Sequence, residues 1–186
     1  MKKILALLMA LCLVCLCGAA LAEVKTADGS PLVLDGFTLN VDSGAAYQLN
    51  EKAVEQLYVT VYPYLSSGDQ ATNFNVVWTG TTGSITVEDV RAEVPGLKEE
   101  MKKGFESYGF TLDSIEYADP VDNTLSGESC VSLDSQMKLS MNGQSVNIIQ
   151  RQYYVGSKGY IFTVSAGDTE TLEGAATRLN SILAWD

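Results

Sequence analysis

Residues 131–155, VSLDSQMKLSMNGQSVNIIQRQYYV, carry the strongest fold signal in the chain. Apolar and polar residues alternate from Val131 to Met141, and this period of two is typical of a strand with one buried face. Asn142-Gly143 follows, the dipeptide that most favours a two-residue hairpin turn, and residues 145–155 continue as a second strand. The stretch therefore predicts a long β-hairpin.

Other segments predict the rest of an antiparallel sheet of about six strands. Residues 32–34 and 37–41 are short apolar runs on either side of Asp35-Gly36, another hairpin-turn dipeptide. Residues 118–123 are rich in turn-forming residues and predict a loop. Three apolar runs predict the remaining strands, at residues 74–79, 111–117 and 160–165.

Residues 51–62 fit an amphipathic helix. Apolar residues recur at positions i, i+3, i+4 and i+7 from Val54 onward, and Asn50 stands at the N-cap position. Within this segment, residues 58–62 are rich in β-branched side chains, which favour strands. A strand over residues 58–62 is therefore an alternative that the sequence leaves open.

Helical patterns also occur in the middle and at the end of the chain. Residues 86–92 open with a Thr-x-x-Asp capping box and predict a short helix. Pro95 suits the first turn of a second helix, which ends near Gly109. Residues 171–185 place their apolar side chains on one stripe, as a helix packed against a sheet does. Together these elements indicate an α+β fold with helices on the faces of the sheet.

The order of elements resembles that of a known fold. A hairpin, helix, strand, helix, antiparallel meander and terminal helix, with the strand motif NFNVVW at residues 73–78, resemble the fold shared by the PsbP subunit of photosystem II and the Mog-type Ran-binding import factors. Small bacterial exported proteins of unknown function also use it. The resemblance covers residues 30–185 and implies a PsbP/Mog-like α/β/α sandwich. This fold hosts docking and accessory proteins more than enzymes, although fold alone does not decide function. No functional residue is carried over from either family.

Residues 1–22 have the three parts of a secretory signal peptide. Lys2 and Lys3 precede an apolar run, and Ala20-Leu21-Ala22 is a small-x-small cleavage site. No cysteine of this segment follows a small residue, so lipidation is not expected. We expect cleavage after Ala22 and a secreted or extracytoplasmic bacterial protein that has no membrane segment after cleavage. Residues 23–30 would be a short polar lead-in, and residues 31–186 one globular α+β domain.

Composition excludes several classes of function. The formal net charge of −11 disfavours binding to nucleic acid, because that binding depends on cationic contacts with phosphates. The chain has no histidine, which excludes serine–histidine and cysteine–histidine catalytic pairs and histidine zinc sites. Cleavage leaves Cys130 as the single cysteine, so no internal disulfide is expected. Ser135 and Lys138 spell S-x-x-K, but in a strand they point to opposite faces, which argues against an acylating pair.

Two groups of residues are candidates for a site. Oxygen atoms of one acidic loop could bind Ca²⁺, although the spacing lacks the EF-hand order and a solvated acidic turn is the alternative. These residues are Asp119, Asp122, Asn123 and Glu128. Tyrosines in two adjacent groups could contact a partner, with a place in the core as the alternative. These are Tyr62, Tyr64, Tyr153 and Tyr154.

The sequence favours a secreted, non-enzymatic accessory or binding domain without a cofactor, whose partner is a protein or a carbohydrate of the cell envelope. One alternative is a carbohydrate- or cell-wall-active hydrolase that uses carboxylates alone, and another is a structural envelope protein. A hydrolase needs an open cleft that holds two carboxyl groups about 5–10 Å apart. A binding module needs an exposed aromatic or apolar patch.

Overall fold

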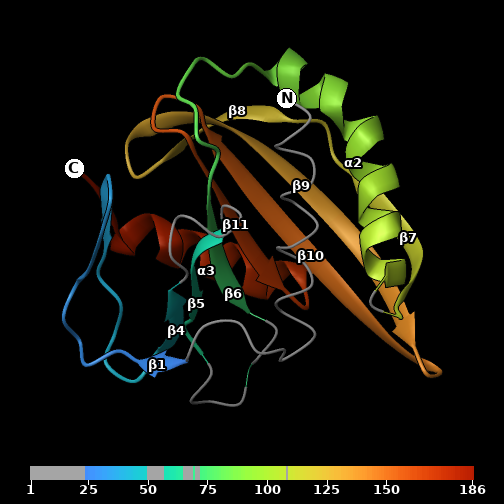
Figure 1. Ribbon diagram of the computed structural model, residues 1–186, viewed down its shortest axis with the longest axis horizontal. Helices are drawn as coiled ribbons and strands as arrows, with labels where there is room; N and C mark the ends of the chain where they lie inside the picture. The colour runs from blue at the N-terminus through green and yellow to red at the C-terminus, as the bar shows by residue number, and fades with distance from the viewer. Residues whose placement is uncertain (1–23, 50–56, 65–68, 70–71, 108) are drawn as a thin grey trace.

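The computed structural model describes residues 24–49, 57–64, 69, 72–107 and 109–186. The expected signal peptide lies outside these residues. Within them the chain forms a nine-stranded antiparallel sheet and a small three-stranded sheet (Figure 1). The main sheet has the order β1-β4-β5-β6-β11-β10-β9-β7, with β8 also paired to β9, and the small sheet has the order β12-β3-β2. No helix in the described ranges is long and apolar enough to span a membrane.

The strands have the following bounds. Those of the main sheet are β1 Lys25–Thr26, β4 Ala46–Leu49, β5 Leu57–Tyr62, β6 Asn73–Trp78, β7 Thr111–Tyr117, β8 Val121–Leu125, β9 Glu128–Met141, β10 Gln144–Val155 and β11 Tyr160–Ala166. Those of the small sheet are β2 Leu32–Leu34, β3 Phe37–Leu39 and β12 Leu183–Trp185. The described helices are α2 Val87–Ser107 and α3 Thr169–Ile182.

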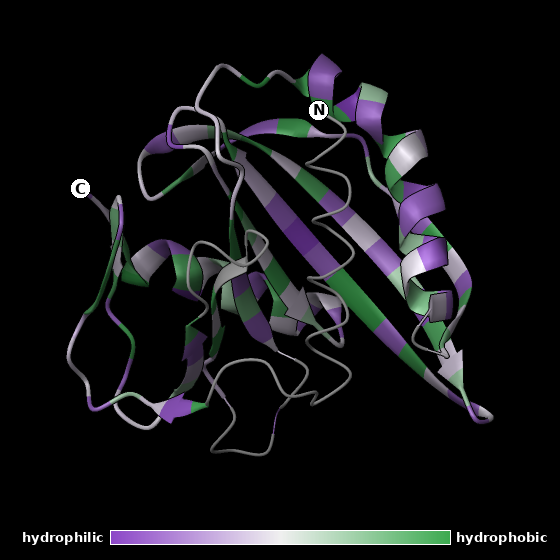
Figure 2. Ribbon diagram, in the orientation of Figure 1, coloured by the Kyte–Doolittle hydropathy of each residue, from purple (hydrophilic) through white to green (hydrophobic). Residues whose placement is uncertain are grey.

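The two helices lie on opposite faces of the main sheet. On β11, Phe162 packs in the cluster that includes α3, whereas its neighbour Ile161 packs in the cluster that includes α2. The same alternation runs along β9 and β10 and is visible as changing hydropathy along these strands (Figure 2). The small sheet joins the α3 side, where Phe37 and Trp185 contact Phe162. The result is an α/β/α arrangement with one apolar cluster on the α3 side and two on the α2 side.

The predicted hairpin is confirmed. β9 and β10 pair from Tyr154 opposite Val131 to Gln144 opposite Met141, so the turn consists of Asn142 and Gly143 alone. Both turn residues have positive φ, 53° and 81°, as a type I′ turn requires. The short hairpin of β2 and β3 at Asp35-Gly36 is confirmed as well.

The helix predicted for residues 51–62 is wrong over residues 57–62, which form β5, and residues 50–56 lie outside the described part. β5 lies inside the sheet between β4 and β6, where Val59 and Val61 are fully buried on the α3 side. The backbones of β4 and β6 form hydrogen bonds with β5 on both sides. β-branched side chains pack well in such a strand. The open alternative of a strand is the correct one for this segment.

The two helices predicted around residues 86–109 are one continuous helix, α2, with Pro95 inside it. A proline in a helix removes one backbone hydrogen bond and disfavours the preceding turn. Here Val90 and Leu97, on either side of Pro95, pack in the same apolar cluster, and this burial holds both halves in line. The capping box is confirmed, since the Thr86 N–H donates to Asp89 Oδ2 at 2.9 Å and the Asp89 N–H donates to Thr86 Oγ1 at 3.2 Å.

Three further predictions need correction. Part of the loop predicted at residues 118–123 belongs to β8, which pairs with the first half of β9 through the turn Ser126-Gly127. The terminal helix ends at Ile182, and the next three residues form β12 against β3. The number of strands consequently exceeds six. β8 and β12 are short, and their strand geometry depends on partners that a local pattern does not reveal.

Candidate functional site

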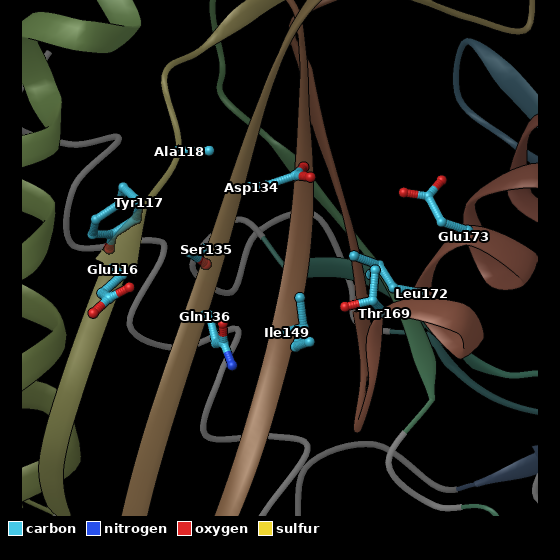
Figure 3. Close-up of a pocket in the computed structure, with 10 residues that line it drawn as sticks. All are labelled: Glu116, Tyr117, Ala118, Asp134, Ser135, Gln136, Ile149, Thr169, Leu172 and Glu173. Carbon is cyan, nitrogen blue, oxygen red and sulfur yellow. The ribbon is translucent and has the colours of Figure 1, made fainter.

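A hollow of 320 Å³ lies on the α3 side of the sheet, between β7, β9, β10 and the first turn of α3 (Figure 3). Register explains which residues line it. Gln136 on β9 stands opposite both Glu116 on β7 and Ile149 on β10, so these three side chains share one face. Leu172 of α3 also lines the hollow. We call this hollow the α3-face groove.

Asp134 and Glu173, which line the α3-face groove, belong to an ion-paired cluster. Arg151 stands directly opposite Asp134 across the β9–β10 pair and donates from Nε and Nη2 to the two carboxylate oxygens of Asp134, at 2.8 and 2.7 Å. Its Nη1 and Nη2 also donate to Glu173 of α3, at 2.9 and 2.8 Å. The Asp134 and Glu173 carboxylates point toward one another (Figure 3), with Arg151 bonded to both. The cluster thus ties the sheet to α3.

Hydrogen bonds within this cluster shift the pKa values of Arg151 and Glu173. The hydrogen bonds that Arg151 donates to Asp134, and then those to Glu173, raise the pKa of Arg151, whose side chain is 18% exposed. The hydrogen bond from Arg151 lowers the pKa of Glu173. Glu173 therefore stays ionised near neutral pH, and the guanidinium of Arg151 is hydrogen-bonded to both carboxylates. With Glu116 also at its edge, the α3-face groove presents more carboxylates than cations.

A second hollow, of 390 Å³, borders the α3-face groove and shares Asp134 and Glu173 with it. Asp119 and Asn123 line this second hollow. Asp122 and Glu128 instead line a third hollow of 420 Å³. The structure therefore splits the predicted calcium ligands into two pairs. Within the described ranges, no three acidic, cysteine or histidine side chains lie close enough to hold a metal ion.

The candidate calcium ligands make other interactions. Asp119 forms an ion pair with Arg91 at 3.8 Å, and Glu128 forms one with Lys158 at 3.6 Å. The side chain of Asn123 donates to Ser132 Oγ at 3.0 Å. Three of the four candidates thus have partners within the protein, and their binding of calcium stays a prediction.

The four candidate tyrosines divide into two kinds. Tyr153 and Tyr154 are 5% and 6% exposed and pack on opposite faces of β10, so they belong to the core. Tyr62 and Tyr64 are half-buried at the end of β5 and just after it. The Tyr62 hydroxyl donates to Gln48 Oε1 at 3.4 Å. Only Tyr62 and Tyr64 keep surface for a partner, and that role stays a prediction.

Cys130 and the S-x-x-K motif have no reactive geometry. Cys130 is 7% exposed, and burial raises the pKa of its thiol to about 11, so it is a small apolar group of the core. Ser135 is buried on the α2 side of β9, whereas Lys138 is exposed on the other side. The two side chains therefore lie on opposite faces of the strand, as the sequence predicted.

Sequence reasoning did not identify Arg151, Asp134 or Glu173. The hairpin register holds a usable signal for two of them, because counting back from Asn142-Gly143 places Asp134 opposite Arg151. A carboxylate and a guanidinium directly opposite on one face form an attractive cross-strand pair. Glu173 comes from α3, and no local pattern links it to the hairpin.

We expect Glu173→Gln to make stability less dependent on pH at the acid end. The pKa of Glu173 is lower in the folded chain than in the unfolded chain. Its contribution is thus complete above the unfolded pKa and disappears as the pH falls through the folded pKa. Because Glu173 is exposed, solvent screening limits the effect to less than about 1 kcal/mol. Urea unfolding at neutral and acidic pH measures it. Glu99 lies on the opposite face of the molecule. If Glu99→Gln changed the pH dependence of stability equally, the effect could not be assigned to the contact between Glu173 and Arg151.

No protein-family model and no curated protein matches the sequence. Among solved structures, the chain is similar to cyanobacterial PsbP (CyanoP) from Synechocystis sp., with 12% sequence identity, a TM-score of 0.52, and coverage of 91% of this chain and 96% of that one. It also matches LpqN, involved in cell envelope biogenesis of Mycobacterium tuberculosis, with 17% identity, a TM-score of 0.32, and coverage of 89% and 91%. The similarity to CyanoP concerns the fold alone. The α+β chain described above has a PsbP-like fold.

Proposed function

We propose that this protein is an extracytoplasmic accessory domain without catalytic activity, which binds a basic segment of a protein partner in the α3-face groove. The observation that carries the proposal is the surplus of carboxylates there. Glu116, Asp134 and Glu173 line the groove, and Arg151 is already bonded to two of them. Lysine or arginine side chains of a partner would complement this surplus.

The chemistry of the groove supports binding over hydrolysis. A glycosidase needs one carboxyl group with a raised pKa, which serves as the general acid. Arg151 lowers the pKa of Glu173 instead, and it donates hydrogen bonds to Asp134 as well. The carboxylate hydrolase considered from the sequence is therefore the less supported alternative.

An extracytoplasmic location is part of the same proposal. Its support is the expected signal peptide with the cleavage site Ala20-Leu21-Ala22. N-terminal sequencing of the protein recovered from the native cell would place the first residue at Glu23. A lipid-modified cysteine at the N-terminus, or an intact Met1, would contradict the proposal.

Isothermal titration with a hexalysine peptide tests the role of the α3-face groove. We expect Glu116→Gln to weaken binding severalfold, because Glu116 is exposed at the edge of the groove and is free to meet a cation. Glu99→Gln removes the same charge from the exposed side of α2 and should leave the affinity unchanged. If both variants weakened binding equally, the peptide would respond only to the net charge of the protein. That result would contradict binding in the α3-face groove.

A further inference from the structure

The turn of the β9–β10 hairpin lies at an exposed end of the main sheet. It extends beyond the end of α2 (Figure 1), and residues 141–147 are all exposed. A Cβ atom added at Gly143 would meet no atom within 4 Å, so the turn is open to solvent. Water and hydroxide ions therefore reach the backbone and the side chain of the dipeptide Asn142-Gly143.

The reactive groups of this dipeptide are not held by other contacts. Among the described residues, neither the side-chain amide of Asn142 nor the N–H of Gly143 makes a hydrogen bond. The pairing of β9 with β10 ends at Met141 and Gln144, so the Gly143 nitrogen lies outside the ladder. The Asn142 amide can therefore rotate toward this nitrogen, and the nitrogen can lose its proton to hydroxide.

An asparagine with this freedom can react with the backbone that follows it. The deprotonated Gly143 nitrogen attacks Cγ of Asn142, an N–C bond forms, and the amide nitrogen of the side chain takes up a proton and leaves as ammonia. The product is a five-membered succinimide, and glycine has no Cβ to hinder ring closure. Water then adds to one ring carbonyl, and the bond from that carbon to the Gly143 nitrogen breaks. Ring opening leaves either aspartate or isoaspartate, in which the main chain runs through the former side chain.

We propose that Asn142 deamidates spontaneously in the folded protein and that its isoaspartate product opens the β9–β10 turn. The two-residue turn needs positive φ at both positions, and φ is 53° at Asn142 and 81° at Gly143. Aspartate tolerates this backbone as asparagine does, but isoaspartate adds a methylene group to the main chain. A turn closed between Met141 and Gln144 has no room for this group. The site is separate from the α3-face groove and independent of it.

Opening of the turn affects the core through the strands on either side of it. Leu139 and Ile148 are buried close to the turn, in the apolar cluster that also contains Met101 and Phe105 of α2. The geometry of a hairpin turn sets the register of its two strands, so loss of the turn weakens the packing of these side chains. Each modified chain also gains a carboxylate. The hairpin thus undergoes a slow change of charge and stability that needs no enzyme.

Two other positions with related chemistry are restrained. Asp28-Gly29 could also form a succinimide, but hydrogen bonds from Ser30 lower the pKa of Asp28, and an ionised carboxylate is a poor electrophile. Asn147 is as exposed as Asn142, but it pairs within the β9–β10 ladder and precedes Ile148, whose branched side chain hinders attack by the backbone nitrogen. Asn147 is therefore an internal control on the same hairpin.

Incubation of the folded chain in H₂¹⁸O at mildly alkaline pH tests the proposal. Mass spectrometry of the tryptic peptide 139–151 measures deamidation, and fragmentation assigns it to Asn142 or Asn147. We expect ¹⁸O-labelled aspartate and isoaspartate at position 142 and unchanged asparagine at position 147. The proposal is overturned if position 142 stays asparagine in the folded chain while the same chain in urea deamidates there, since the turn would then protect it. Equal deamidation at Asn147 would also overturn it, because the rate would then not depend on the turn.

Two variants separate the effect on the turn from the effect of charge. Asn142→Gly removes the reacting amide and keeps a residue suited to positive φ. Incubation should lower the urea midpoint of the parent as its isoaspartate content rises, and should leave the midpoint of Asn142→Gly unchanged. Asn142→Asp carries the added carboxylate without the methylene group and should unfold near the midpoint of the fresh parent. If an incubated parent rich in isoaspartate unfolds at the same urea concentration as the fresh parent, the turn tolerates this product and the proposed opening is wrong.

Discussion

Replacing Phe162 by alanine is expected to lower the free energy of unfolding by about 3–5 kcal/mol. The ring is fully buried on β11, and its centroid lies 5.3 Å from that of Phe37 and 5.5 Å from that of Trp185. It therefore joins the main sheet to the small sheet. Truncation removes these edge-to-face contacts and leaves a cavity between two rigid sheets. The urea concentration at the unfolding midpoint measures the loss.

Two further variants make this result interpretable. Val33→Ala, on the edge strand of the small sheet, changes a residue that is 75% exposed and should alter stability by less than about 0.5 kcal/mol. Phe162→Leu keeps most of the volume and should give an intermediate loss, which stays measurable if the alanine variant does not fold. An alanine variant as stable as the parent would show that the two sheets do not meet at Phe162.

Gly156→Ala is expected to destabilise the protein by about 1–3 kcal/mol. A Cβ atom at this position would lie 2.4 Å from the carbonyl oxygen of Gly83 and 2.8 Å from Cγ1 of Ile85. The backbone of Gly83 cannot retreat freely, because its N–H donates to the Gly156 carbonyl at 2.9 Å. The added methyl group must therefore break this contact between the loop before α2 and the end of β10. Urea unfolding gives the magnitude.

Gly174→Ala is the matched control, because the same change should have the opposite sign there. Gly174 is exposed in α3, and an added Cβ would meet no atom within 4 Å. Alanine in place of glycine inside a helix stabilises by about 0.5–1 kcal/mol. Loss of stability in both variants would mean that the close approach of Gly83 does not explain the effect at Gly156.

The parts of the fold that could be predicted from sequence are those decided by neighbouring residues. Asn142-Gly143 sets its own turn, and the alternation along β9 records which face is buried. β5 could not be assigned, because its side chains also satisfy the spacing of a helix and its two partner strands decide between them. β12 depends on β3, which is far away in the sequence.

The candidate site was less accessible to prediction, because it combines elements that are distant in the chain. Asp134 and Arg151 follow from the hairpin register, but Glu173 joins them only when α3 packs on the sheet. Asp122 and Asn123 are adjacent in sequence, yet they point into different hollows because successive residues of β8 alternate in direction. Their proximity in sequence predicted one acidic cluster, but the alternating directions of side chains along β8 place them in two different hollows.

The pairing of β12 with β3 has a consequence for the order in which the protein can fold. Phe37, close to the start of the described chain, stands opposite Trp185, the residue before the last. During synthesis the aromatic cluster around Phe37 is incomplete until residue 185 has been made, and closing so long a loop slows folding. The β9–β10 hairpin has only local contacts to make and is able to form first. A nascent or truncated chain that lacks residues 183–185 would therefore leave β3 without its partner β12 and expose the small sheet.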